Sequence, residues 1–160
     1  MQGRFQACGL ELHPEKTKIV YCKGGYNKLN YSVVNFDFLG YTFGPKRIKT
    51  KKGQFGVYFV PRISQKKAKL IRQEINSWPW LKWIPQGLSK IKYYSRSRLL
   101  GWLNYYGVFG KTLIRNTLFH FDKRLSRWAK KKYKKLKSLM QAARWVNNLR
   151  KQKACSFPHW

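Results

Sequence analysis

The spacing of apolar residues changes at Ser64 from a period of two to a period near 3.6, and this change constrains the fold more than any other feature of the chain. Before Ser64, short runs of β-branched and aromatic residues alternate with Gly and Pro, which is typical of strands and turns. After Ser64, apolar residues recur every three or four positions, which indicates amphipathic helices. The order predicts an α+β chain, with a small antiparallel β-element followed by a bundle of about four helices.

The β-element is predicted from three apolar runs and the turn residues between them. The expected strands are Thr17–Cys22, Phe36–Phe43 and Phe55–Val60. The basic segment Pro45–Gly53 is predicted to be the turn between the last two, and Pro61 is predicted to end the third strand.

The first ten residues predict the last turns of a helix that begins upstream. The segment Arg4–Leu10 has this character, and Gly9 is a candidate helix stop. We therefore expect the chain to be a fragment of a longer protein.

Four helices are predicted after Ser64 from the positions of their apolar residues. Ser64 is placed to cap the first helix and Pro79 to stop it, while Thr112 is a candidate cap for the third. The small Ser95 predicts close approach by a neighbouring helix. The expected apolar stripes are, in chain order, Ala68, Ile71, Ile75 and Trp78; Leu88, Ile91, Ser95, Leu99, Trp102, Tyr106 and Phe109; Ile114, Leu118, Phe121, Leu125 and Trp128; and Leu139, Ala143 and Val146.

The charge balance indicates a polyanionic partner. The chain has 35 Lys and Arg against 5 Asp and Glu, a formal net charge of +30, together with 7 Trp, 10 Tyr and 10 Phe. A basic but solvated surface on an unrelated domain and a disordered tail are the alternatives, and disorder is disfavoured because disordered chains are poor in aromatic residues. Composition therefore predicts a folded protein that binds nucleic acid.

Membrane, secreted and metal-binding classes are disfavoured. No run approaches the roughly 18 consecutive apolar residues of a membrane span, and the first ten residues lack the apolar run of a secretory signal. We expect a cytoplasmic, bacterial-type protein that is not secreted and has no membrane partner. Cys8, Cys22 and Cys155 show no paired spacing, and Cys155 with His159 supplies at most half of a tetrahedral shell, so no metal site is expected.

Catalytic residues are not expected in this chain. Polymerases and nucleases that use Mg²⁺ need convergent carboxylates. The acidic residues are not closely paired, and they are Glu11, Glu15, Asp37, Glu74 and Asp122.

Two segments in the first part of the chain carry a family resemblance. The run Cys8-Gly-Leu-Glu-Leu-His-Pro-Glu-Lys-Thr-Lys-Ile-Val20 and the run Phe36-Asp-Phe-Leu-Gly-Tyr-Thr-Phe43 resemble the end of the palm of a group II intron reverse transcriptase. Further segments resemble the thumb and maturase-specific domain (domain X) of the same family: Ile63-Ser64, Leu100-Gly-Trp-Leu-Asn-Tyr-Tyr-Gly107, Arg127-Trp-Ala-Lys-Lys-Lys-Tyr133 and Phe157-Pro-His-Trp160.

The resemblance implies a protein that binds its own intron RNA and assists its splicing. It also implies two parts: residues 1–62 as a palm remnant with a basic β-hairpin, and residues 63–160 as the helical thumb and maturase-specific module. Because the family's Tyr-x-Asp-Asp segment is absent, we expect no polymerase activity from this chain alone and no cofactor. Mg²⁺ would enter only if a separate fingers-palm polypeptide supplied the missing palm. That polypeptide is therefore a possible second partner beside group II intron RNA. A C-terminal piece of a split RNA-directed DNA polymerase and a non-functional relic stay open as alternatives.

Two sets of residues are candidates for contact with nucleic acid. The resemblance places a palm-remnant set near the template-primer, although these side chains could equally open a strand or fill a core: Lys16, Thr17, Phe38, Leu39 and Gly40. The RNA-binding set combines the basic turn, a polar surface of the second helix and the Lys run after the third stripe, which position an RNA backbone and do not read its sequence. Its members are Lys46, Arg47, Lys49, Lys51, Lys52, Arg96, Arg98, Asn104, Tyr105, Arg127, Lys130, Lys131, Lys132, Tyr133, Lys134 and Lys135.

Overall fold

The computed structural model describes residues 2–15, 17–22, 31–50, 53–152 and 156–160. The chain divides into two compact units, one of residues 1–38 and 43–60 and one of residues 39–42 and 61–160. The boundary predicted at residues 62 and 63 stays a prediction.

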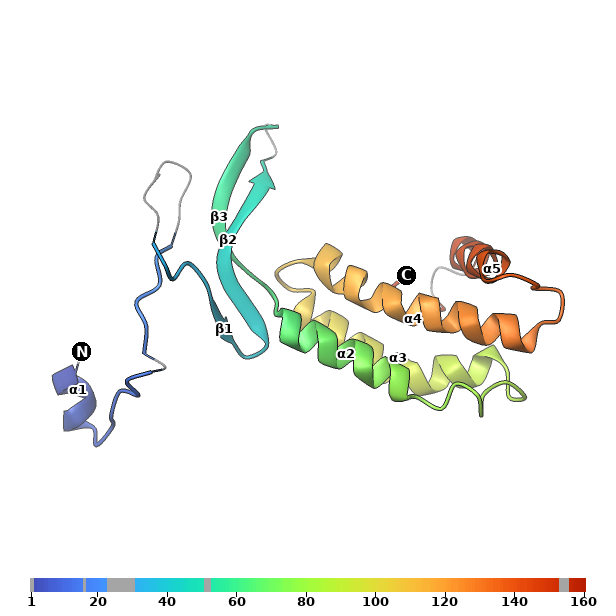
Figure 1. The fold of residues 1–160 in the computed structure, drawn as a ribbon, viewed down its shortest axis with the longest axis horizontal. Helices are drawn as coiled ribbons and strands as arrows, with labels where there is room; N and C mark the ends of the chain where they lie inside the picture. Colours follow the sequence, from blue (N-terminus) through green and yellow to red (C-terminus); the bar gives the residue numbers. More distant parts are fainter. Residues whose placement is uncertain (1, 16, 23–30, 51–52, 153–155) are drawn as a thin grey trace. The chain divides into compact units, whose positions relative to one another are not determined.

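A three-stranded antiparallel sheet precedes the main helices, as predicted (Figure 1). Its strands lie in the order β1 (Phe36–Phe38), β2 (Tyr41–Lys49) and β3 (Phe55–Ile63). The ring of Phe36 stacks on that of Phe43, with centroids 5.0 Å apart. This cross-strand pair stabilises the β1–β2 hairpin.

The predicted single strand Phe36–Phe43 is wrong, because the chain reverses inside it. Leu39 and Gly40 both have positive φ, 49° and 82°, and form a tight turn between β1 and β2. Positive φ at both central residues is the requirement of the type I′ hairpin turn. A Leu at the first of these positions gave no turn signal in the sequence.

Two further boundaries of the β-element differ from prediction. The segment Pro45–Gly53 is not a turn throughout, because β2 continues to Lys49 and the turn is closed by the N–H of Gly53 donating to the C=O of Thr50 at 2.9 Å. Pro61 does not end the third strand, since β3 continues to Ile63. As β3 is an edge strand, a residue without an N–H is tolerated there.

The predicted strand Thr17–Cys22 is also wrong, because this segment has no strand conformation. The N–H of Tyr21 donates to the C=O of Val33 at 3.0 Å, and the two tyrosine rings of Tyr21 and Tyr31 lie 4.2 Å apart. These local contacts hold the segment without a β-ladder. Nearer the N-terminus, α1 (Gln2–Ala7) agrees with the predicted helix end, and Gly9 follows it with φ 68°.

The first of the main helices, α2 (Gln65–Ser77), begins and ends as predicted. The Ser64 hydroxyl accepts a hydrogen bond from the N–H of Lys67 at 3.2 Å, so it caps the helix. The helix ends before Trp78, whose backbone is extended next to Pro79. Its buried face is formed by Ala68, Ile71 and Ile75.

The other three helices are α3 (Leu88–Tyr106), α4 (Lys111–Lys132) and α5 (Leu139–Gln152). The predicted α4 stripe is confirmed, with Ile114, Leu118, Phe121, Leu125 and Trp128 all buried. Thr112 is not the cap, because Gly110 precedes the first turn and provides no side-chain cap. Three stripe positions differ from prediction. Phe109 is exposed beyond the end of α3, Leu139 is exposed at the start of α5, and α5 buries Ala142 in place of Ala143.

Helix α4 is the centre of the helical unit, because it packs against α2, α3 and α5 (Figure 1). Ser95 of α3 is completely buried, and the close approach predicted there stays a prediction. Aromatic rings fill the core beside these helices, with Phe121 in contact with Trp78, Trp80 and Phe157. In the parts of the chain that the structure describes, no helix is both long and apolar enough to span a membrane.

Candidate nucleic-acid interface

The C-terminal half of α4 carries a row of basic side chains on the side away from its core. Leu125, Trp128 and Ala129 are buried and fix the rotation of the helix. The side chains of Arg127, Lys130 and Lys131 therefore lie on the opposite face of the helix and are exposed. Three Lys in the last turn also interact favourably with the negative end of the helix dipole.

The side chains of Lys132 and Tyr133 make contacts within the helical unit. Lys132 donates from Nζ to the C=O of Ile84 and lies 5.8 Å from the Trp128 ring. Tyr133 is the C-terminal cap of α4, and its half-buried ring contacts Trp128 and Trp145. The Tyr133 ring thus packs within the helical unit.

The Lys run continues past the end of α4, where it lines a cavity. Lys134 and Lys135 are exposed and line a cavity of about 440 Å³ with Tyr133, Leu136 and Trp145. A ligand that carries both a flat apolar group and a negative charge could bind in this cavity, with its charge beside the lysines.

The two arginines predicted on α3 have different surroundings. Arg96 is exposed. Arg98 forms an ion pair with Glu74, Nε to Oε1 3.4 Å, and its guanidinium lies 4.7 Å from the Tyr94 ring. A phosphate would have to compete with Glu74 for Arg98, so Arg96 is the more available of the two.

Asn104 and Tyr105 are exposed near the end of α3, where Tyr105 is held by a turn of the sheet. The Tyr105 hydroxyl donates to the C=O of Leu39 at 3.0 Å, and the Tyr41 hydroxyl donates to the C=O of Tyr105. Burial first, and then the neighbouring Tyr105, raises the pKa of both Tyr41 and Tyr106. Both hydroxyls therefore stay protonated at neutral pH, which keeps the Tyr41 hydroxyl a donor to the C=O of Tyr105.

The palm-remnant residues are divided between the two units. Leu39 and Gly40 lie in the turn against α3, where a Cβ added to Gly40 would lie 2.7 Å from the Tyr106 hydroxyl oxygen. Gly40 thus permits close approach by the Tyr106 side chain. Phe38 and Thr17 are exposed in the other unit, so Phe38 is not a core residue, and Lys16 lies outside the described residues.

The basic residues predicted on the hairpin lie on β2 and are described only in part. Lys46 is half-buried, while Arg47 and Lys49 are exposed. The Arg47 guanidinium lies 4.7 Å from the Phe55 ring, and Lys49 Nζ lies 5.9 Å from it. Lys51 and Lys52 fall outside the described residues.

The sequence interpretation missed Arg124, which lies between Arg127 and the loop from Trp78 to Gly87. Its guanidinium lies 5.8 Å from the Trp80 ring. Burial and then the charge of Arg127 lower the pKa of Arg124, although it stays charged at neutral pH. The spacing of Arg124, Arg127 and Lys131 on one helical face was the available signal.

His120 is a second missed residue, one turn before Arg124. Its Nε2 lies 2.9 Å from Oδ1 of Asn76. Burial lowers the pKa of His120, and the neighbouring charges of Arg72, Arg124, Lys123 and Arg127 lower it further. The imidazole is therefore neutral at pH 7, and its Nε2–H can donate to Asn76.

The two carboxylates of the helical unit, Glu74 and Asp122, interact with other side chains of that unit. Glu74 pairs with Arg98, and Asp122 is buried against His159 and Trp160. Among the residues with described positions, no group of three His, Cys, Asp or Glu side chains could hold a metal ion. This surface can bind anions by charge and by hydrogen bonds from Lys and Arg.

Comparison with known proteins gives one match. The family described as "Group II intron, maturase-specific domain" matches residues 68–148, which is half of the chain. The match covers most of α2, all of α3 and α4, and the larger part of α5. No curated protein and no solved structure matches the chain significantly.

Proposed function

The chain belongs to the group II intron proteins that carry a maturase-specific domain, and from this premise we propose that it binds folded group II intron RNA and assists splicing of that RNA. The proposal applies to the helical unit, which contains the matched residues. The sheet with its basic hairpin is proposed to add a second contact to the RNA backbone.

The observation that carries the proposal is the excess of uncompensated positive charge on α4 and the segment after it. From Lys123 to Lys137 the chain has nine Lys and Arg and no Asp or Glu. Most of these side chains are exposed, and the nearest carboxylate in sequence, Asp122, points into the core. So many like charges repel one another unless a polyanion lies beside them.

This charge favours recognition of RNA shape over sequence. Lys and Arg neutralise phosphates and release counterions, which gives affinity that falls steeply with salt. Folded RNA presents closely spaced phosphates and a few unpaired bases, so a broad rigid basic surface can prefer a compact RNA to an extended one. Binding of this kind would assist splicing by stabilising the active RNA fold.

A splicing assay tests the second half of the proposal. A group II intron precursor RNA is incubated at a Mg²⁺ concentration at which the RNA alone folds incompletely, with and without the protein. We expect the rate of intron excision to rise with protein concentration and to saturate. A rate unchanged at protein concentrations that saturate binding would leave an RNA-binding protein without a splicing role.

A further inference from the structure

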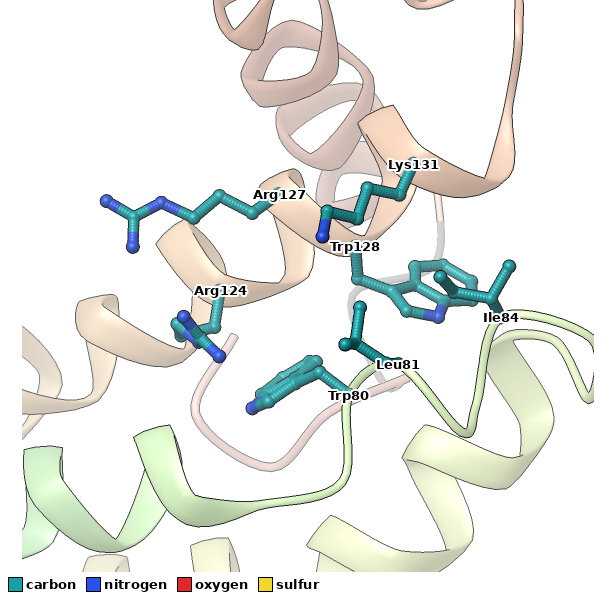
Figure 2. A pocket seen from close by; sticks show the side chains of 7 residues that line it. All are labelled: Trp80, Leu81, Ile84, Arg124, Arg127, Trp128 and Lys131. Atoms are coloured by element: carbon teal, nitrogen blue, oxygen red, sulfur yellow. The ribbon is translucent and has the colours of Figure 1, made fainter.

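A cavity of about 220 Å³ opens between α4 and the loop that joins α2 to α3 (Figure 2). It combines two kinds of surface, because α4 contributes mainly cations and the loop contributes apolar side chains. The lining residues are Arg124, Arg127, Trp128 and Lys131 from α4 and Trp80, Leu81 and Ile84 from the loop.

The cationic side of the cavity lacks a counter-charge. No Asp or Glu is among the lining residues. The Nε atom of Arg124 is buried and has no hydrogen-bond partner within the described part of the chain. Because a partly buried guanidinium without a nearby counter-charge is costly, an anion bound in the cavity would recover free energy.

The apolar side carries a second unmade hydrogen bond. Trp80 donates from Nε1 to the C=O of Ile75 at 2.7 Å, but the buried Nε1 of Trp128 has no partner among the residues described. The Trp128 indole lies beside Leu81 and Ile84 in Figure 2. A flat ligand would cover the apolar wall of the cavity.

We propose that this cavity holds one unpaired nucleotide of the bound RNA. The base enters beside Leu81 and Ile84, while its flanking phosphates contact Arg124, Arg127 and Lys131. A nucleotide carries the flat group and the negative charge together. This inference rests on the proposed binding of RNA and adds a site to it.

The size of the cavity limits the occupant. Pockets that enclose a drug-sized ligand have roughly 300–1,000 Å³. A cavity of about 220 Å³ therefore accommodates a single base with its sugar and phosphates outside. Trp80 and Trp128 are only 5% and 2% exposed, so the base contacts the edges of these rings and the side chains at the rim.

The test compares two probes that have the same phosphates and differ in their bases. One is a short single-stranded RNA, and the other is a chain of equal length and charge made of abasic nucleotides. We expect the RNA to bind about tenfold more tightly than the abasic chain, because one base held in the cavity contributes binding free energy of that order. Equal binding of the two probes would overturn the nucleotide site.

Variants locate the preference in this cavity. Leu81 is 63% exposed at the rim, so Leu81→Trp fills the opening without a change in charge or core. Leu70→Trp is the matched control, because Leu70 is 47% exposed on α2 and does not line the cavity. We expect Leu81→Trp to abolish the preference for base-bearing RNA and Leu70→Trp to keep it; retention in both variants would overturn the site.

Photocrosslinking provides a readout that does not depend on a variant. RNA that carries 4-thiouridine is crosslinked to the unaltered protein, and the attached peptides are identified by mass spectrometry. The proposal expects crosslinks at Trp80, Leu81 or Trp128, and crosslinks confined to other segments would contradict it.

The results for the two proposals can be told apart. If the protein binds folded intron RNA but binds the two short probes equally, only the nucleotide site is contradicted. If the protein does not bind intron RNA, the proposed function itself is contradicted.

Discussion

The Nε2 atom of His159 lies 3.0 Å from Oδ1 of Asp122, and both side chains are buried. Trp160 donates from Nε1 to the same oxygen at 2.9 Å. Two residues at the end of the described chain are thereby fastened to the middle of α4. This arrangement fixes the helix that presents the basic surface.

Asp122→Ala is expected to destabilise the helical unit by about 3 kcal/mol, because it leaves the buried donors of His159 and Trp160 without an acceptor. The free energy of unfolding from urea titration, followed by tryptophan fluorescence, measures the effect. Glu74→Gln is the control, since its pair with Arg98 is exposed and contributes less than about 1 kcal/mol. A loss for Asp122→Ala no greater than the control's would contradict the fastening role.

Gly40→Ala is expected to destabilise the protein by about 2 kcal/mol, because a Cβ would lie 2.7 Å from the Tyr106 hydroxyl oxygen and φ is 82°. Gly101→Ala is the matched control. Gly101 is exposed on α3, a Cβ there meets nothing within 4 Å, and Ala favours a helix over Gly by about 1 kcal/mol. The melting temperatures of the two variants should therefore shift in opposite directions. A Gly40→Ala variant as stable as the parent would show that the turn does not need Gly.

His120 is expected to make the helical unit less stable in mild acid. Its pKa is lowered in the folded protein, so the unfolded chain binds the proton first. The stability that this depression contributes is fully present above the unfolded pKa of about 6.5 and is lost as the pH falls through the folded pKa. Urea unfolding at pH 7.5 and pH 5 should show a smaller difference for His120→Gln than for the parent, and an equal difference would exclude His120 as the cause.

Replacement of Lys130, Lys134 and Lys135 by Gln is expected to weaken binding to all RNAs and to reduce the slope of log K against log salt by about 2–3. These three side chains are exposed, whereas Lys132 also bonds the C=O of Ile84 and is left in place. The control replaces Lys66, Lys69 and Lys151 by Gln, which removes the same charge from exposed positions on α2 and α5. Equal losses in both triple variants would indicate a non-directional charge effect.

The helices could be predicted from the sequence because local spacing determines which face of each helix is apolar. Ser64, Ile71 and Trp128 have the predicted roles as cap and core residues. The strands were predicted less well, because the reversal at Leu39 and Gly40 depends on packing against α3, far along the chain.

The candidate interface could be predicted in its charge but not in its detail. The Lys run was visible in the sequence, and its placement on RNA stays a prediction. The contacts of Arg124 with Trp80 and of Asp122 with His159 join residues 37 or more positions apart, so no local pattern indicates them.

Competition binding tests the central claim most directly. The affinity of the protein for a folded group II intron RNA is measured against an unrelated structured RNA of the same length, across a range of salt concentrations. The account predicts tighter binding to the intron at every salt concentration, with affinities for both RNAs that fall steeply as salt rises. Equal affinity for the two RNAs would contradict recognition of the intron and leave only general attraction to a polyanion.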